Sequence, residues 1–266
     1  MTDQTEIPFA VVTGASSGIG YELARQFAEH GFDLLVTSET QRIDDAAQRL
    51  RTLGAQVEAV QANLATYEGV EQLYERIRAM RRPVDAIAIN AGVGVGGPFV
   101  ENDLAAELNL IALNVTSVVH LSKLVVKDMA ARNEGRILFT ASIAAEGPAP
   151  FEAVYGASKA FVLSFAEALR NELEDTNIVV TALQPGATET NFFHRAGMEN
   201  TKVGAGKKSD PADVAREGFE ALMASKDHVV SAMLKEKAMV VAGQVTPETM
   251  KAEQHRKLSE PGSANA

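Results

Sequence analysis

Tyr155 and Lys159, four residues apart, are the pair of side chains in this sequence with the clearest capacity for acid/base chemistry. On a helix, this spacing places both side chains on one face. A free phenol has a pKa of about 10, and a nearby ammonium favours its charged form. At about 4 Å and an effective dielectric of about 20, the two charges attract by about 4 kcal/mol. We therefore expect Lys159 to lower the pKa of Tyr155 toward working pH, although such pairs also occur as ordinary surface residues.

Ser142 lies thirteen residues before Tyr155, at the end of a predicted strand. Strand ends and the loops after them are the ligand-binding edge of parallel sheets, so this placement favours a functional role for the tyrosine and lysine. No G-x-S-x-G elbow surrounds Ser142, which argues against a serine nucleophile. The histidines show no metal-ligand spacing, and the chain has no cysteine, so we expect no metal site.

A glycine-rich stretch near the start of the chain, TGASSGIG (Thr13–Gly20), separates an apolar run from a helical pattern. A strand, a glycine turn and a helix form a phosphate-binding turn, because the helix start offers unpaired N–H groups and a partial positive charge. We assign Gly14 to the tight turn, Gly18 to the approach of a pyrophosphate, and Gly20 to packing of the helix against the sheet. Ser16 and Ser17 add hydroxyl donors. A turn without a ligand is the alternative, since glycine also serves ordinary turns.

Apolar runs typical of buried strands alternate with helical patterns along the chain. Continuous apolar strands separated by helices indicate a parallel sheet covered on both faces, and right-handed crossovers make it doubly wound. We expect one α/β domain over residues 1–258 with a Rossmann fold of about seven strands and helices on both faces. The predicted strands are 9–14, 33–38, 56–64, 85–92, 135–142, 177–186 and the candidate 228–232; the predicted helices are 19–30, 41–53, 68–81, 103–132 and 153–175.

The composition is that of an ordinary globular protein, with 46% hydrophobic and 23% charged residues and a net charge of −10. The acidic balance argues against nucleic acid and anionic membranes as partners. The start MTDQTEIPF lacks the features of a signal peptide, and no run of about 18 apolar residues predicts a membrane span. Together with the absence of cysteine, these features predict a cytoplasmic protein. The end of the chain, 259–266, is expected to be a flexible tail.

Further motifs follow the glycine turn in a fixed order: NAG at 90–92, Asn114, Ser142, YGASK at 155–159 and PGATET at 185–190. With the pattern T-G-x-x-x-G-I-G, these motifs resemble those of the short-chain dehydrogenase/reductase (SDR) family over residues 13–190. The resemblance implies an oxidoreductase that transfers a hydride between NAD or NADP and a small secondary alcohol or ketone.

The same resemblance implies roles for the catalytic candidates. Tyr155 exchanges a proton with the substrate oxygen, Lys159 lowers the pKa of Tyr155 and binds the nicotinamide ribose, and Ser142 holds the substrate oxygen. Asn114 supports a water-linked proton relay. The chain departs from the family at Asn63, where Asp is usual. The cofactor-binding candidates are Gly14, Ser16, Ser17, Gly18, Ile19, Gly20, Ser38, Glu39, Asn63, Leu64, Asn90, Ala91, Gly92, Tyr155, Lys159, Pro185, Gly186, Thr188 and Thr190.

The end of the second predicted strand, LLVTSETQR, decides between the two cofactors, because it faces the adenosine ribose in this fold. Glu39 can accept hydrogen bonds from two ribose hydroxyls, and it would repel a 2′-phosphate by about 3 kcal/mol at about 5 Å with an effective dielectric of about 20. We therefore favour NAD over NADP. Two alternatives stay open: a shift of one residue puts Ser38 at this position, and Arg42 can pair with a phosphate.

The substrate side is less specific in the sequence. We expect a substrate loop near 191–210, with Ser142, Phe151, Phe193 and Met198 lining the pocket, although the apolar residues also suit ordinary packing. The predicted helices 103–132 and 153–175 are apolar on more than one face, which predicts a homodimer or homotetramer. The alternatives in function are an NADPH-dependent carbonyl or 3-oxoacyl reductase and a catalytically silent dinucleotide-binding regulator.

Overall fold

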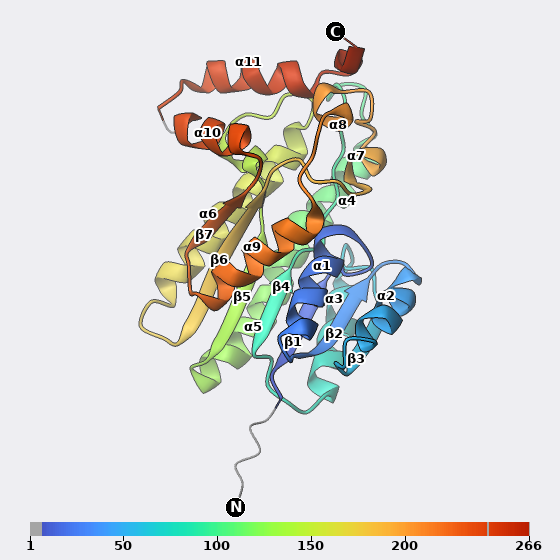
Figure 1. Ribbon diagram of the computed structural model, residues 1–266, viewed down its shortest axis with the longest axis vertical. Coiled ribbons are helices and arrows are strands. Elements are labelled where there is room, and N and C mark those ends of the chain that lie inside the picture. The colour runs from blue at the N-terminus through green and yellow to red at the C-terminus, as the bar shows by residue number, and fades with distance from the viewer. Residues whose placement is uncertain (1–6, 244, 266) are drawn as a thin grey trace, which may run out of the picture.

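A seven-stranded parallel sheet forms the centre of the part of the protein that the computed structural model describes, residues 7–243 and 245–265 (Figure 1). The strand order β3-β2-β1-β4-β5-β6-β7 reverses its winding between β1 and β4. A ligand crevice opens at such a reversal, outside the carboxyl ends of the strands. The predicted doubly wound fold is confirmed. The strands are β1 (Phe9–Thr13), β2 (Asp33–Ser38), β3 (Val57–Gln61), β4 (Ala86–Ile89), β5 (Gly135–Thr140), β6 (Ile178–Pro185) and β7 (His228–Ser231).

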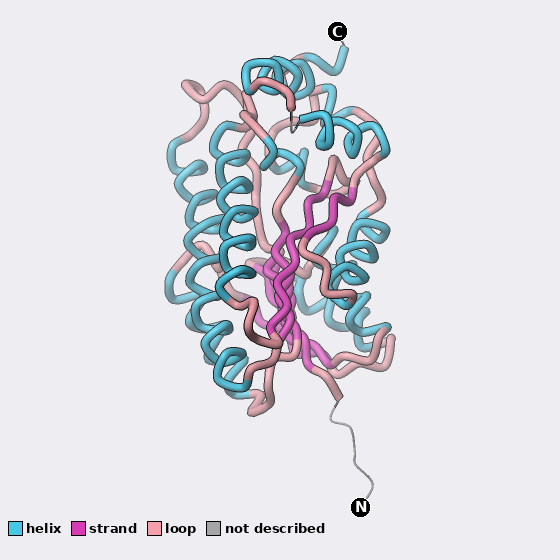
Figure 2. Tube along the Cα trace, turned by 90° about the vertical axis from the view of Figure 1, so that its left-hand side faces the viewer, coloured by secondary structure: helices cyan, strands magenta, loops and turns pink. Residues whose placement is uncertain are grey.

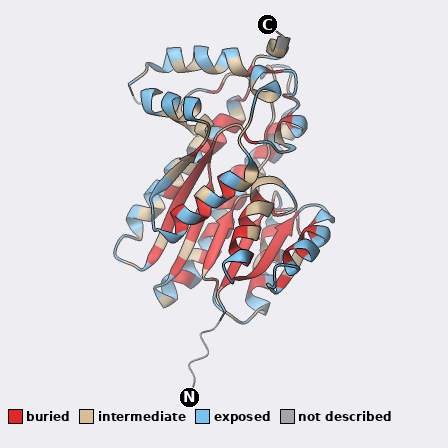
Figure 3. Cartoon of the chain, viewed as in Figure 1, coloured by how far each residue is buried: buried red, intermediate tan, exposed pale blue. Residues whose placement is uncertain are grey.

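Helices cover both faces of the sheet (Figure 2). The strands between them are largely buried (Figure 3), and each presents apolar side chains alternately to its two sides. In β1, Phe9 and Val11 belong to one hydrophobic cluster, whereas Ala10 and Val12 belong to the other. The cluster with Phe9 is completed by α3 (Tyr67–Ala79), α5 (Ser117–Arg132) and α6 (Ala153–Glu172). The cluster with Ala10 is completed by α1 (Gly18–Glu29), α2 (Arg42–Arg51) and α9 (Pro211–Met223).

The helices differ from the prediction in two ways: one predicted helix is divided, and one helix was not predicted. The predicted helix 103–132 is divided into α4 (Leu104–Ile111) and α5 by a π-helical turn at Ala112–Thr116. Helix α9 was not predicted, although its start carries a recognisable signal: Asp210 accepts a hydrogen bond from the backbone N of Ala212 at 2.8 Å, and a proline opens the first turn.

The C-terminal part of the chain crosses the carboxyl end of the sheet, at the top of Figure 1. It includes α10 (Leu234–Gly243) and α11 (Glu248–Ser259), neither of which was predicted, and two short helices, α7 (Phe192–Arg195) and α8 (Lys202–Ala205), lie in the predicted substrate loop. Beyond α11, Ser263 Oγ accepts a hydrogen bond from Lys202 N at 3.0 Å. Ala264 N donates to Asn200 O at 3.1 Å. The flexibility expected for residues 259–266 stays a prediction.

The helical stretch Leu104–Arg132 is long and apolar enough to cross a membrane if only length and composition are considered. Its inner side nevertheless contributes Val118, Leu121 and Val125 to the core beneath the sheet. A core helix of a soluble protein passes the same test, so the stretch is weak evidence for a membrane segment. The expected lack of a membrane span stays a prediction.

Candidate active site

One cavity of about 610 Å³ opens at the carboxyl ends of the strands, beside the reversal of strand order. Its walls come from the glycine turn after β1, from the ends of β2 to β6, and from the C-terminal helices. Every residue assigned above to cofactor binding lines this cavity, and so does Ser142. The sequence motifs, although spread from Thr13 to Thr190, are therefore brought together in space.

The glycine turn is shaped by backbone contacts that leave no room for side chains. Gly14 has a φ of +69°, and a Cβ there would lie 2.9 Å from the Cα of Ala91. A Cβ on Gly20 would collide with the backbone carbonyl of Gly14. Gly20 therefore lets the start of α1 pack against Gly14, which directly follows β1, and against the side chain of Asn90, which directly follows β4. At the helix start, Ser17 forms no side-chain capping bond, so the first N–H groups of α1 remain available to an anionic ligand.

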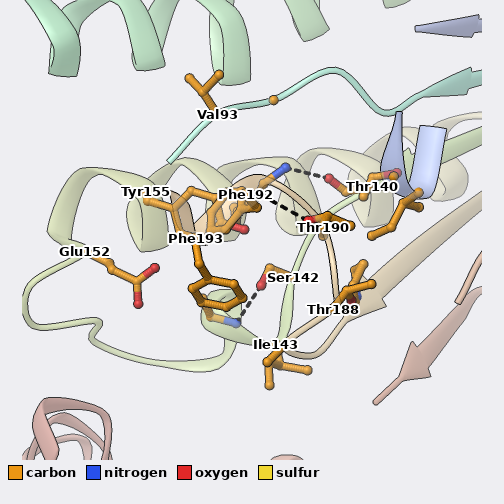
Figure 4. Close-up of a pocket in the computed structure, with 18 of the residues that line it drawn as sticks. Val93, Thr140, Ser142, Ile143, Glu152, Tyr155, Thr188, Thr190, Phe192 and Phe193 are labelled. Carbon is orange, nitrogen blue, oxygen red and sulfur yellow. Dashed lines mark hydrogen bonds between the residues drawn. The ribbon is translucent and has the colours of Figure 1, made fainter. Parts of the chain in front are cut away.

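Ser142, Tyr155 and Lys159 all line the cavity. Figure 4 shows Ser142 and Tyr155 beside it. Tyr155 and Lys159 occupy the first two turns of α6, and Ser142 follows β5. Ser142 Oγ accepts a hydrogen bond from the backbone N of Ala144 at 3.1 Å, and Lys159 Nζ donates to the carbonyl of Thr140 at 2.8 Å. All three side chains are buried. Backbone groups at and just after the end of β5 thus hold Ser142 and Lys159 in place.

Burial is the main cause of the pKa shifts of Tyr155 and Lys159. Desolvation raises the pKa of Tyr155 above its usual value, a hydrogen bond with Ser142 acts in the opposite direction, and the negative charge of Glu152 raises the pKa further. Burial also lowers the pKa of Lys159 to about 8. The expected lowering of the Tyr155 pKa by Lys159 is therefore wrong for the free chain. The ammonium points to Thr140 O and lies 5.9 Å from the centre of the tyrosine ring, so its attraction does not outweigh desolvation.

Asn114 lies behind the cavity wall, in the π-helical turn between α4 and α5. Its Oδ1 accepts from Val93 N at 3.0 Å, while its Nδ2 donates to Val93 O at 2.9 Å and to Ser158 Oγ at 3.1 Å. The side chain is fully buried, and it joins the segment after β4 to α6. Single π-helical turns inside α-helices frequently lie at functional sites, and this one contains Asn114.

Of the predicted apolar substrate contacts, the structure places only Phe193 in the cavity wall. Phe151 and Met198 do not line the cavity. The ring of Phe151 packs under the guanidinium of Arg256 at 5.1 Å, and the side chain of Met198 fills the space beside Gly96. Phe192, which was not assigned, lines the cavity, and its ring centre lies 5.1 Å from that of Tyr155.

The residues that sequence reasoning missed come mainly from the C-terminal helices. Helix α10 contributes Glu236 and Met239 to the cavity wall, and α11 contributes Lys251, His255 and Ser259. No local motif marks these positions, because the packing of α10 and α11 over the sheet depends on contacts with residues distant in sequence. Across residues 7–243 and 245–265, no group of three or more potential metal ligands gathers at one place.

At the opposite end of the cavity, Ser38, Glu39 and Arg42 all line the wall. Ser38 is buried and donates its hydroxyl to the carbonyl of Thr40 at 2.9 Å, whereas Glu39 is exposed. Ser38 and Arg42, the two alternatives that the sequence left open, thus line the same cavity as Glu39.

Residues 8–200 of the chain match the family model described as short chain dehydrogenase. This protein belongs to the short chain dehydrogenase family. Membership makes it an oxidoreductase of CH–OH and C=O groups that uses NAD or NADP. The glycine turn and the Ser142–Tyr155–Lys159 group lie within the matched residues.

Alignments with individual relatives cover different shares of this chain. It is 34% identical over 201 residues to mouse 17-beta-hydroxysteroid dehydrogenase type 3, an alignment that covers 73% of this chain and 65% of the mouse protein. A short-chain dehydrogenase from Sphingobium yanoikuyae in complex with NADPH is 30% identical, with a TM-score of 0.80 over 90% of this chain and 94% of that chain. The 3-ketoacyl-(acyl-carrier-protein) reductase from Brucella melitensis, complexed with NADH, is 26% identical, with a TM-score of 0.72 over 84% of this chain and 96% of that chain.

Proposed function

We propose that this short chain dehydrogenase interconverts a secondary alcohol and a ketone with Tyr155 as the acid/base. The observation that carries the proposal is the placement of Ser142, Tyr155 and Lys159 on one wall of the cavity that the glycine turn also lines. When bound, NAD or NADP supplies or accepts the hydride. The protein then has to move one proton and to hold the substrate oxygen.

In the direction of reduction, Tyr155 Oη donates its proton to the substrate oxygen, and in oxidation it accepts a proton from the alcohol. Ser142 Oγ orients that oxygen, because its hydroxyl lines the cavity close to Tyr155. Lys159, held by Thr140 O, supplies positive charge near the phenol. The raised pKa of Tyr155 in the free chain keeps the phenol protonated at neutral pH, which suits the donor role in ketone reduction. Asn114 contributes to this proposal by fixing the backbone of Val93 at the edge of the cavity.

Substitution of Tyr155 by Phe tests the mechanism, because it removes only the hydroxyl. We expect kcat for ketone reduction to fall by about 100-fold or more, since general acid catalysis contributes about 10² to 10⁴. The affinity for the dinucleotide, measured by fluorescence titration, should hardly change. Activity that persists in this variant would contradict the role of Tyr155. A wild-type protein that binds dinucleotide but turns over no member of a ketone and alcohol panel would favour the silent regulator.

We favour NAD as the cofactor, because Glu39 lies exposed at the adenosine end of the cavity. Arg42 lines the same end and supports the alternative, an NADPH-dependent carbonyl or 3-oxoacyl reductase. The similarity to a 3-ketoacyl reductase is consistent with that substrate class. Parallel titrations with NAD⁺ and NADP⁺ decide between the two, and a clear preference for NADP⁺ would overturn the argument from Glu39.

We propose a second copy of this chain as the protein partner, in a homodimer or homotetramer. Five of the exposed large apolar side chains lie on α4 and the short segment before it: Phe99, Val100, Leu104, Leu108 and Ile111. Contiguous exposed apolar surface of this kind marks a contact with another protein. Light scattering should give the mass of a dimer or tetramer, and a monomer at micromolar concentration would contradict the proposal. A cytoplasmic location stays a prediction.

A further inference from the structure

Glu152 is a buried carboxylate in the wall of the cavity, three residues before Tyr155. It precedes the first turn of α6, where its backbone carbonyl accepts a hydrogen bond from Gly156 N at 2.8 Å. The residue before it, Phe151, has a φ of +66°, a left-handed conformation that costs free energy in a residue with a side chain. This backbone reversal lies directly before Glu152, whose carboxylate lines the cavity shared by Ser142 and Tyr155 (Figure 4).

Only one oxygen of this carboxylate is used by the protein. Oε2 accepts hydrogen bonds from Ser259 Oγ at 2.9 Å, and it lies 3.0 Å from His255 Nε2, both on α11. Among the described residues, no group donates a hydrogen bond to Oε1. A carboxylate has two oxygens and about four acceptor positions. Oε1 is not among the solvent-inaccessible polar atoms that lack a partner, so a ligand in the cavity can reach it. The second oxygen is therefore a vacant acceptor beside the predicted catalytic residues.

Charges around the carboxylate restrict what it can accept. Glu146 and Glu236 also line this half of the cavity, and each is engaged with the protein: Glu146 with Gln184, and Glu236 with the backbone N of Ala187 and Met233. Lys251 on α11, which also lines the cavity, donates to Glu146 O at 3.0 Å and to Glu248 at 2.9 Å. A substrate carboxylate in this place would meet several like charges, whereas a hydroxyl or amino group would find a free acceptor.

We propose that Glu152 Oε1 binds a second hydrogen-bond donor of the substrate, so that the preferred substrates are ketones or secondary alcohols that carry a further hydroxyl or amino group. Ser259 and His255 are positioning residues for this contact, because they hold the other oxygen. The proposal rests on the proposed function, since the reacting oxygen of the same molecule must lie at Ser142 and Tyr155. A site built to bond a substrate donor discriminates strongly against analogues that lack it.

A matched set of cyclohexanones tests the proposal: cyclohexanone itself, 3- and 4-hydroxycyclohexanone, 4-aminocyclohexanone and 4-oxocyclohexanecarboxylate. In the wild-type protein we expect kcat/KM for at least one hydroxy or amino ketone to exceed that for cyclohexanone by about tenfold, which corresponds to one charge-assisted hydrogen bond. The carboxylate ketone should be the poorest substrate. Comparison of the hydroxy ketones with the amino ketone shows whether Glu152 prefers a neutral hydroxyl donor or a charged ammonium donor.

The Glu152→Gln variant should reverse this order. With its oxygen held by Ser259, the amide presents N–H groups to the cavity and carries no charge, so kcat/KM for the favoured donor ketone should fall by about tenfold and that for the carboxylate ketone should rise. A misfolded variant would not show a higher kcat/KM for the carboxylate ketone, so this increase separates a change in binding from a loss of folding. The control is Glu253→Gln, a carboxylate on the exposed side of α11 that pairs with Lys257, which should change neither value.

Two outcomes would overturn the assignment and are distinguishable. If cyclohexanone is reduced in a Tyr155-dependent way and Glu152→Gln leaves all ratios unchanged, Glu152 does not bind substrate while the proposed function stands. If no ketone or alcohol is turned over with either dinucleotide, the proposed function fails, and the substrate contact fails with it. Should Glu152→Gln prove unstable, Glu152→Ala gives the same comparison, with the donor preference expected to disappear.

Discussion

The glycine turn at one end of the cavity and the helices α10 and α11 at the other are held in place by different kinds of contact. The glycine turn is fixed by contacts to neighbouring backbone: Thr13 Oγ1 accepts from the backbone N of Asn90 and Ala91, and no Cβ fits at Gly20 against the carbonyl of Gly14. The C-terminal helices are fixed by side chains, through His255 and Ser259 on Glu152. From this difference we expect the glycine turn to tolerate substitution poorly, and we expect the proposed substrate end to tolerate it better.

Gly20→Val provides the strongest test of this contrast. The added side chain collides with the carbonyl of Gly14, so the turn must move. We expect dinucleotide affinity to fall by about 100-fold or more and the free energy of unfolding to drop by about 2–3 kcal/mol, as in other overpacked sites. Calorimetric titration and chemical denaturation measure the two effects.

The control for this substitution is Gly243→Ala on α10, where the nearest neighbour of an added Cβ lies 3.8 Å away. Its dinucleotide affinity should match that of the wild type. Near-normal affinity in Gly20→Val would show that the turn is more adaptable than its contacts imply.

The double variant His255→Ala with Ser259→Ala should weaken the substrate end alone. Removal of both partners of Glu152 Oε2 frees α11 from α6, so we expect KM for ketones to rise by about tenfold, the effect of one or two lost hydrogen bonds to a charged group. Dinucleotide affinity should be preserved. A parallel loss of dinucleotide binding would mean that the two ends are not independent.

The same difference between local and distant contacts explains which site residues could be predicted from the sequence. Gly14, Ser142 and Tyr155 stand in short motifs whose spacing follows strand ends and helix turns, so their meeting in one cavity could be predicted. Glu152 and His255 lie 103 positions apart, and only the packing of α11 over the sheet brings them together. Phe151 failed as a predicted pocket residue because its left-handed backbone directs the ring to Arg256.

The adenosine end allows a test of intermediate size. Glu39→Ala removes the exposed carboxylate while leaving Arg42 in place, so NADP⁺ should gain affinity relative to NAD⁺. We expect the ratio of the two dissociation constants to change by about tenfold, less than the full Coulomb energy because solvent screens an exposed charge. Titration of both dinucleotides against both proteins measures it. An unchanged ratio would assign the cofactor choice to Ser38 or Arg42.

The smallest effect is expected in the pH profile of Glu152→Gln. In the wild type, the negative charge of Glu152 raises the pKa of Tyr155, because it disfavours a second negative charge on the phenol. Loss of that charge lowers the pKa of Tyr155. Alcohol oxidation needs the phenolate, so the rising limb of its pH–rate profile should move to lower pH. The shift should be less than about 1 pH unit, because desolvation is the larger cause of the raised pKa of Tyr155 and remains in the variant. The profile of kcat/KM for cyclohexanol, which carries no second donor, isolates this shift from the binding contact, and a shift to higher pH would contradict the sign of the interaction.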